Sequence, residues 1–283
     1  MKSNIPELLK RLLSCGRRFP RHAFIVGAQK CGTGSLHYYL TQHPGIAGAA
    51  QKEVQFFHKD ANYNKGTGWY LSRFPMWNRR RIALESTPAY LYVPVAAERI
   101  HRFAPAAKII IVLREPVARA FSAFNMYAQM FGEKHWLSRL ATTSPEVRAF
   151  YEGIARGEQK PEIGAFLERE LSIEREGLPD REPALIRRGL YAAQVKRYLD
   201  LFGPDQVLVV FSKDLAANPD AVVNRVFDFL GLSRLDHLDL KPQHVRGYSV
   251  DPEVRRQIEA VAGERFEKDK QLLAEVLGEP VPW

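Results

Sequence analysis

The fold class of this 283-residue chain is decided by one stretch, Gly27-Ala28-Gln29-Lys30-Cys31-Gly32-Thr33-Gly34-Ser35. It follows an apolar run, His22 to Val26, and opens a helical stretch from Thr33 to Gln42. A glycine-rich turn lets the backbone approach an anion closely, and the free N–H groups at a helix start point toward it. Lys30 adds a full positive charge. The pattern predicts a phosphate-binding loop between a strand and a helix.

The order of residues in this loop differs from that of a nucleotide P-loop, although the spacing of Gly27 and Gly32 is the same. A Walker A loop places lysine directly after the second glycine. Here Thr33 follows Gly32, and Lys30 precedes that glycine by two residues. The alternative interpretation, a strand-to-helix turn that binds no ligand, stays open on these residues alone.

Composition restricts the class of protein. Apolar residues make up 46% and charged residues 26%, which is ordinary for a globular domain and excludes a disordered chain or a coiled coil. Two cysteines, Cys15 and Cys31, are too few for a disulfide scaffold or a four-ligand zinc site. The net charge of +9 favours an anionic partner such as a nucleotide, nucleic acid, acidic glycan or anionic lipid.

Strands alternate with helices along the chain. The strand candidates are His22 to Val26, Arg81 to Leu84, Lys108 to Leu113 and Gln206 to Phe211, and the later helix candidates are one opened by Pro116, Ala184 to Phe202 and Pro219 to Leu230. Continuous β-branched runs are typical of strands buried on both faces of a parallel sheet. We therefore predict an α/β fold of the P-loop type, with three α/β/α layers and a central parallel sheet.

We expect one domain over residues 1–283, with a helical extension over 1–21 and a helical insertion over 132–183. No apolar run approaches the length of about 20 residues that spans a bilayer. The segment Ile5 to Leu13 lacks the apolar core of a signal peptide, so we expect a cytoplasmic protein with at most peripheral membrane contact. The oligomeric state is left open.

A second anion motif follows the strand Lys108 to Leu113. Arg114 stands at the carboxyl end of that strand, where ligands bind in open α/β sheets. Ser122 lies eight residues further on, just over two helical turns, so it can share a face with the helix start. In a Walker B strand an aspartate would stand near the place of Arg114. Taken alone, this pair is better interpreted as an ordinary surface arginine and a helical serine.

Together the two motifs resemble those of sulfotransferases that use 3′-phosphoadenosine 5′-phosphosulfate (PAPS). The loop Gly27 to Thr33 is similar to their 5′-phosphosulfate loop, and Arg114 to Ser122 is similar to their 3′-phosphate motif. Further blocks resemble the branch of heparan sulfate sulfotransferases: Lys52-Glu53-Val54-Gln55-Phe56-Phe57, Gly68-Trp69-Tyr70-Leu71, Glu85-Ser86-Thr87-Pro88-Ala89-Tyr90, Gly189-Leu190-Tyr191 with Gln194, and Phe227 to Leu232. The resemblance covers about residues 22 to 283 and is vaguest over the insertion.

The resemblance implies a sulfotransferase that moves the sulfuryl group of PAPS to an acceptor hydroxyl and releases PAP, with no metal. It implies catalytic roles for Glu53, as the base, and Lys30, which stabilises the leaving PAP. The cofactor-binding residues it implies are Lys30, Cys31, Gly32, Thr33, Gly34, Ser35, Arg114, Ser122, Arg246 and Gly247. The acceptor class stays open among a carbohydrate or glycolipid, a lipid alcohol and a small metabolite, and transfer to an amine is the less favoured alternative.

Two departures from the branch concern the acceptor and the cofactor loop. Relatives carry lysine where this chain has Ser86, on the acceptor side, which puts a heparan-like acceptor in doubt. The stretch Lys241 to Asp251 is short and has no cysteine, whereas animal members carry a disulfide hairpin. A bacterial, cytoplasmic protein fits that loss.

Other residues are weaker candidates for the acceptor side. His58 is the second candidate for the base. Trp69, Tyr70 and Tyr90 either stack on an acceptor or pack in the core. Two further functions are kept as alternatives: a P-loop nucleotide kinase, against which the displaced Lys30 argues, and a non-catalytic nucleotide or nucleic-acid binder. We expect no nucleic-acid partner, because no helix-turn-helix or RNA-binding signature is present.

Overall fold

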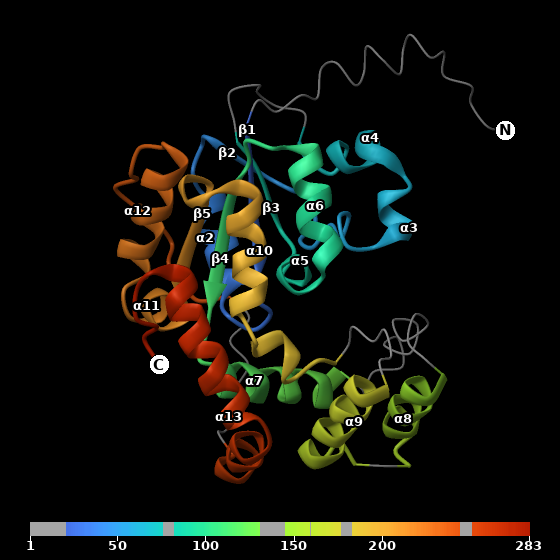
Figure 1. The fold of residues 1–283 in the computed structure, drawn as a ribbon. Helices are drawn as coiled ribbons and strands as arrows, with labels where there is room; N and C mark the ends of the chain where they lie inside the picture. Colours follow the sequence, from blue (N-terminus) through green and yellow to red (C-terminus); the bar gives the residue numbers. More distant parts are fainter. Residues whose placement is uncertain (1–20, 76–81, 131–144, 159, 177–182, 244–250) are drawn as a thin grey trace, which may run out of the picture. The chain divides into compact units, whose positions relative to one another are not determined.

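The computed structural model describes residues 21–75, 82–130, 145–158, 160–176, 183–243 and 251–283 (Figure 1). Its strands are β1 (Arg21–Gly27), β2 (Ile46–Gly48), β3 (Ile82–Ser86), β4 (Lys108–Leu113) and β5 (Val207–Phe211). Its α-helices are α2 (Thr33–Thr41), α3 (Asp60–Tyr63), α4 (Gly66–Leu71), α5 (Ala89–Tyr92), α6 (Pro94–Phe103), α7 (Pro116–Met130), α8 (Pro145–Ala155), α9 (Ile163–Glu176), α10 (Ala192–Phe202), α11 (Ser212–Ala217), α12 (Pro219–Leu230) and α13 (Pro252–Leu277). Short 3₁₀ turns span Arg187–Gly189 and Pro204–Gln206.

Contacts within the chain divide it into two compact units. The first comprises the described residues of Met1–Leu113 and Lys196–Val245, and the second those of Arg114–Val195 and Arg246–Trp283. All five strands belong to the first unit, so the sheet and its loops can be described there as one body. The prediction of one domain over residues 1–283 stays a prediction.

The sheet of the first unit has the strand order β2-β3-β1-β4-β5, and every neighbouring pair is parallel. Its centre is apolar because Ile109 to Leu113 of β4 are fully buried. Helix α2 contacts β1, β2 and β3 and packs beside α12, whereas α5 contacts β1 and packs beside α6. Figure 1 shows α2 behind the sheet and α10 in front of it. The predicted α/β fold with a parallel sheet flanked by helices is confirmed.

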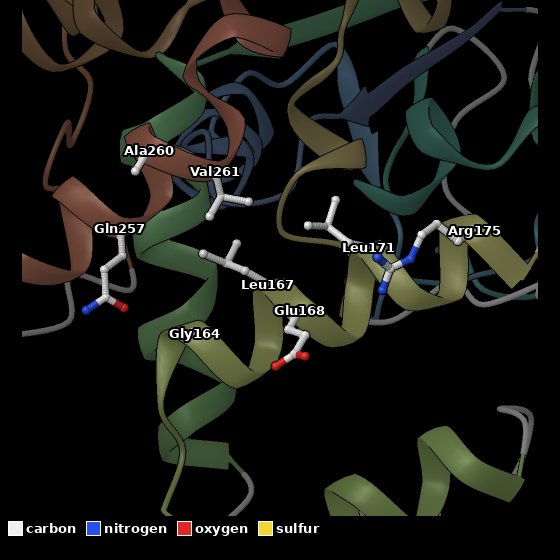
Figure 2. Close-up of a pocket in the computed structure, with 8 residues that line it drawn as sticks. All are labelled: Gly164, Leu167, Glu168, Leu171, Arg175, Gln257, Ala260 and Val261. Atoms are coloured by element: carbon white, nitrogen blue, oxygen red, sulfur yellow. The ribbon is translucent and has the colours of Figure 1, made fainter.

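The second unit is helical, and its apolar core joins α7, α8, α9 and α13. The predicted insertion contributes α8 and α9 to this core, and α7 and α13 come from the flanking sequence. A cavity of about 330 Å³ lies between α9 and α13, lined by Gly164, Leu167, Glu168, Leu171, Arg175, Gln257, Ala260 and Val261 (Figure 2). Leu167 of α9 and Val261 of α13 point toward one another there, and the lining also includes the polar side chains of Glu168, Arg175 and Gln257.

The predicted helix from Ala184 to Phe202 is wrong in its first eight residues, because α10 begins only at Ala192. The carboxylate of Glu170 accepts hydrogen bonds from the N–H groups of Ile186 and Arg187 at 2.8 Å each. The carboxylate of Asp269 on α13 accepts the N–H groups of Tyr191 and Ala192. Backbone donors that would lie inside a longer helix are thus bonded to carboxylates from α9 and α13.

Three smaller differences concern the ends of elements. Strand β3 runs on to Ser86, two residues past its predicted end, whereas Arg81 lies outside the described residues. Strand β5 begins at Val207, one residue after its predicted start, because Gln206 is the last residue of a 3₁₀ turn and its backbone N–H donates to the carbonyl of Gly203 at 3.2 Å. The short strand β2 follows Pro44-Gly45, where the sequence indicated only a break.

Candidate functional site

The loop after β1 has the backbone conformation that a close anion contact requires. Gly32 is the residue before α2, with a φ of 94°, and no side chain caps the helix there. Lys30 also has a positive φ, 69°, which turns the chain back toward the helix start. A Cβ atom on Gly27 would lie 2.4 Å from the Cβ of Leu91, so only glycine fits between β1 and α5. The loop is fixed by the fold and leaves the first turn of α2 without a side-chain cap.

The hydroxyl groups predicted to bind phosphate lie in the first turn of α2. Thr33 and Ser35 are both buried, as is the thiol of Cys31, which fills the inside of the loop. Ser35 Oγ accepts the N–H of Gln243 at 2.9 Å. The first N–H groups of a helix have no intrahelical partner. With Lys30 beside them, they form a set of donors that fits a phosphate group, which is the chemistry that a PAPS-binding loop needs.

Glu53 lies in the same unit, in the segment between β2 and α3. Its side chain is 36% exposed, and its Oε1 atom is 3.5 Å from the Nζ of Lys52. His37 on α2 is close enough to Lys52 that burial and this positive charge lower the pKa of His37 to about 4. The segment that carries Glu53 therefore lies beside α2, the helix that the phosphate loop opens.

Glu85, at the carboxyl end of β3, is a buried carboxylate with 1% of its surface exposed. Thr87 Oγ1 donates to its Oε1 at 2.5 Å, and the hydroxyl of Tyr90 lies 3.0 Å from each carboxylate oxygen. The hydroxyl of Tyr70 on α4 donates to Oε2 at 3.3 Å, and the backbone N–H of Val54 is also bonded to the carboxylate.

Burial raises the pKa of Glu85 to about 7, because desolvation outweighs the hydroxyl and amide donors that favour the charged form. Tyr70, Tyr90 and Tyr198 face it, and burial raises the pKa of each tyrosine above its ordinary value. Sequence reasoning assigned Glu85 no role. The available signal was a glutamate at the end of an apolar strand, Ile82-Ala83-Leu84, where a charge needs several donors.

The second anion motif opens the second unit, directly after β4. Ser122 is buried in α7, and the backbone carbonyl of Arg114 accepts the hydroxyl of Tyr191 at 2.9 Å. The N-terminus of α7 is capped by Glu115, whose carboxylate accepts the N–H groups of Val117 and Ala118 at 2.9 and 2.7 Å. Its helix dipole thus already faces a negative charge. The motif has two cationic side chains, Arg114 and the fully buried Arg119.

The remaining sequence candidates fall in three places. Arg246 and Gly247 lie outside the described residues. Tyr70 and Tyr90 pack in the core, which was one of the two alternatives for them, and the ring of Trp69 contacts the guanidinium of Arg73 at 4.2 Å. His58 is buried, with its ring 5.6 Å from that of Tyr90.

Within the described residues, no group of three or more His, Cys, Asp or Glu side chains is placed to hold a metal ion. In the same part of the chain, no helix combines the length and the apolar character that crossing a membrane demands.

Comparison with known proteins decides the family. Residues 20–244 match the sequence model described as "Sulfotransferase domain", and this range holds both anion motifs and Glu53. The chain belongs to the sulfotransferase domain family. Members of this family are transferases of sulfur-containing groups and use PAPS as the donor. The family predicted from the motifs is thereby confirmed.

Relatives of this sulfotransferase-family chain include heparan sulfate enzymes. It is 34% identical over 219 residues to human heparan sulfate glucosamine 3-O-sulfotransferase 6, covering 77% of this chain and 54% of that protein. It is 31% identical over 230 residues to mouse heparan sulfate glucosamine 3-O-sulfotransferase 3A1, covering 81% and 50%. The chain thus spans about half the length of the curated relatives it matches.

A bacterial crystal structure is similar over nearly its whole length. The sulfotransferase from Alicyclobacillus acidocaldarius is 30% identical, with a TM-score of 0.66, and the match covers 92% of this chain and 97% of that one. This chain is therefore similar both to animal heparan sulfate sulfotransferases and to a bacterial sulfotransferase.

Proposed function

We propose that this protein is a PAPS-dependent sulfotransferase that acts on a hydroxyl group, with Glu53 as the base and Lys30 as the group that stabilises the leaving PAP. The observation that carries the proposal is the uncapped start of α2, with Lys30 and Gly32 both at positive φ beside it. Family membership favours this function over a nucleotide kinase and over a non-catalytic binder.

The residues proposed to bind the 5′-phosphosulfate are Lys30 and the backbone N–H groups and hydroxyls from Cys31 to Ser35. Arg114 and Ser122, with Arg246 and Gly247, are the proposed 3′-phosphate ligands on the strength of their sequence motifs. A charge-assisted contact between such donors and a phosphate is shorter and stronger than a neutral one. Binding of PAPS and of PAP should depend on these side chains and should persist in EDTA.

The reaction moves one sulfuryl group between two oxygens. The bond between sulfur and the phosphate oxygen breaks, and its electrons stay on PAP, where the ammonium of Lys30 stabilises them. The bond between sulfur and the acceptor oxygen forms, and the hydroxyl proton passes to Glu53. Such transfers are catalysed mostly by positioning and by electrostatic stabilisation of the leaving group. Glu53 suits the role of base because its carboxylate is only partly buried and an acceptor can reach it.

The acceptor is proposed to be a hydroxyl-bearing glycan, with glycolipid, lipid alcohol and small metabolite as alternatives. The names of the relatives, heparan sulfate glucosamine 3-O-sulfotransferases, support a glycan for this chain too. Ser86 favours an acceptor other than heparan sulfate, because this residue is only 1% exposed and brings no positive charge to an acidic acceptor. A neutral or weakly charged glycan fits both observations.

Two measurements test this function. Calorimetry in EDTA should show that PAP binds in the micromolar range, which corresponds to about −8 kcal/mol, while ATP and a DNA oligonucleotide bind far more weakly. Labelled PAPS should transfer sulfate to one member of a panel of neutral glycans, heparan sulfate and lipid alcohols. Binding of ATP only with magnesium would favour the kinase, and tight DNA binding that falls steeply with salt would favour the nucleic-acid binder.

A further inference from the structure

The segment Val54–Phe57, directly after Glu53, is bonded through its backbone N–H groups to the surroundings of Glu85. The N–H of Val54 is bonded to the carboxylate itself. The next three reach it through one hydroxyl each: Gln55 N–H to Thr87 Oγ1 at 3.3 Å, Phe56 N–H to the Tyr90 hydroxyl at 2.9 Å, and Phe57 N–H to the same hydroxyl at 3.3 Å. Successive amides of one segment thus converge on one side chain.

The direction of these hydrogen bonds is set by the carboxylate. A hydroxyl group has one proton to donate and lone pairs with which to accept. Thr87 and Tyr90 both accept from the segment, so each has its proton free to donate to Glu85, and both lie within hydrogen-bond distance of it. Bonds to an ionised acceptor are about twice as strong as neutral ones, and chains of them polarise one another. A buried carboxylate is what this arrangement of donors requires.

Contacts on the carbonyl side of the same segment hold it from the other direction. The side-chain amide of Asn62 donates to the carbonyls of Val54 and Gln55 at 3.3 and 3.2 Å. Arg99 donates to the carbonyl of Phe57 at 3.3 Å and pairs with Asp60 at 2.6 Å. The Glu53 side chain itself is partly exposed, so its place in the site follows from the backbone that these contacts fix.

We propose that Glu85 is a positioning residue for the sulfuryl transfer: through Thr87, Tyr90 and the Val54 amide it holds the segment that presents Glu53. This inference rests on the proposed function only for the part that Glu53 plays. The holding of the segment by Glu85 can be tested without any acceptor.

The test is hydrogen–deuterium exchange of the full chain, with two buried tyrosines compared. Tyr90→Phe removes the hydroxyl between Glu85 and the amides of Phe56 and Phe57. Tyr191→Phe is the matched control, because this tyrosine is also fully buried and its hydroxyl also donates to a backbone carbonyl at 2.9 Å, that of Arg114 in the second unit, which takes no part in the hydrogen bonds of Glu85. We expect exchange of the Val54–Phe57 peptide to rise by about tenfold or more in Tyr90→Phe and to stay within about twofold in the control. Equal exchange in the two variants would overturn the proposal.

A conservative replacement separates positioning from simple core stability. Glu85→Gln keeps an oxygen that accepts from the Thr87 and Tyr90 hydroxyls, so it should retain most of the protection of the segment, whereas Glu85→Ala should lose it even where PAP affinity is unchanged. Protection that survives in a folded Glu85→Ala variant would contradict the proposal. If Tyr90→Phe loosens the segment but Glu53→Gln transfers sulfate at the wild-type rate, the assignment of the base fails, and the holding of the segment by Glu85 remains supported.

Discussion

At the scale of single residues, burial of Glu85 makes its charged form costly to the stability of the fold. Its folded-state pKa of about 7 lies above the ordinary value of 4.5, so the folded state holds a proton that the unfolded chain has already released between these two pH values. The free energy of unfolding should therefore fall as pH rises from about 4.5 to about 7. The change is at most about 3.5 kcal/mol, because each pH unit between the two pKa values corresponds to about 1.4 kcal/mol.

Glu85→Gln removes this titration. We expect the stability of the variant relative to wild type to increase between pH 5 and pH 8, as measured by urea unfolding at closely spaced pH values. A difference that does not change with pH would show that the Glu85 carboxyl titrates near its ordinary value. A stability difference that increases with pH, together with the expected exchange result, would show that Glu85 positions the segment at a cost in stability.

Gly27 makes a second prediction at this scale. Gly27→Ala would place a Cβ atom 2.4 Å from that of Leu91, so the variant should lose about 1–3 kcal/mol of stability. Gly68→Ala is the matched control, because a Cβ there meets nothing within 4 Å and alanine favours helix α4 by about 0.4–1 kcal/mol. Urea unfolding of both variants measures the difference. A Gly27→Ala variant as stable as wild type would mean that β1 and α5 can move apart freely.

At the scale of secondary-structure elements, one carboxylate decides where α10 begins. Asp269 of α13 accepts the N–H groups of Tyr191 and Ala192, and burial raises its pKa. Asp269→Ala should cost up to about 2 kcal/mol, more than Asn218→Ala, which removes an exposed cap of α12. Denaturant unfolding compares the two. Asp269→Asn should lose less stability than Asp269→Ala, because asparagine keeps one oxygen that can accept a backbone N–H. An Asp269→Ala variant no less stable than Asn218→Ala would contradict the special role of this cap.

The elements also show how far sequence reasoning reaches. Strand β4 and helix α12 were predicted at their observed bounds, because a continuous β-branched run and a helix between Pro219 and Gly231 carry local signals. The start of α10 was missed because it depends on carboxylates of α9 and α13, which are distant in sequence. The role of Glu85 was missed because only part of its surroundings is local: Thr87 and Tyr90 are close to it in sequence, but Tyr70 and the Val54 amide join them only in the fold.

At the scale of the whole molecule, the net charge of +9 agrees with a protein that binds a multiply charged donor. In the first unit the phosphate loop and Glu53 follow the carboxyl ends of parallel strands, where α/β sheets bind ligands, and Glu85 lies at such an end within β3. The family, and with it the donor that its members use, was therefore predictable from motifs, and the residues that bind this donor stay a prediction. The acceptor was not, because its contacts depend on side chains such as Ser86 whose exposure only the fold decides.

The central claim, a PAPS-dependent transfer with separate donor and base residues, is tested most directly by comparing Glu53→Gln with Lys30→Ala. PAP affinity is measured by calorimetry, and sulfate transfer from labelled PAPS is measured with the acceptor found in the panel. Glu53→Gln should bind PAP as wild type does and transfer sulfate about 10²–10⁴-fold more slowly, as loss of a general base predicts. Lys30→Ala should lose both affinity and rate. Wild-type transfer by Glu53→Gln, or unchanged PAP affinity in Lys30→Ala, would contradict the account.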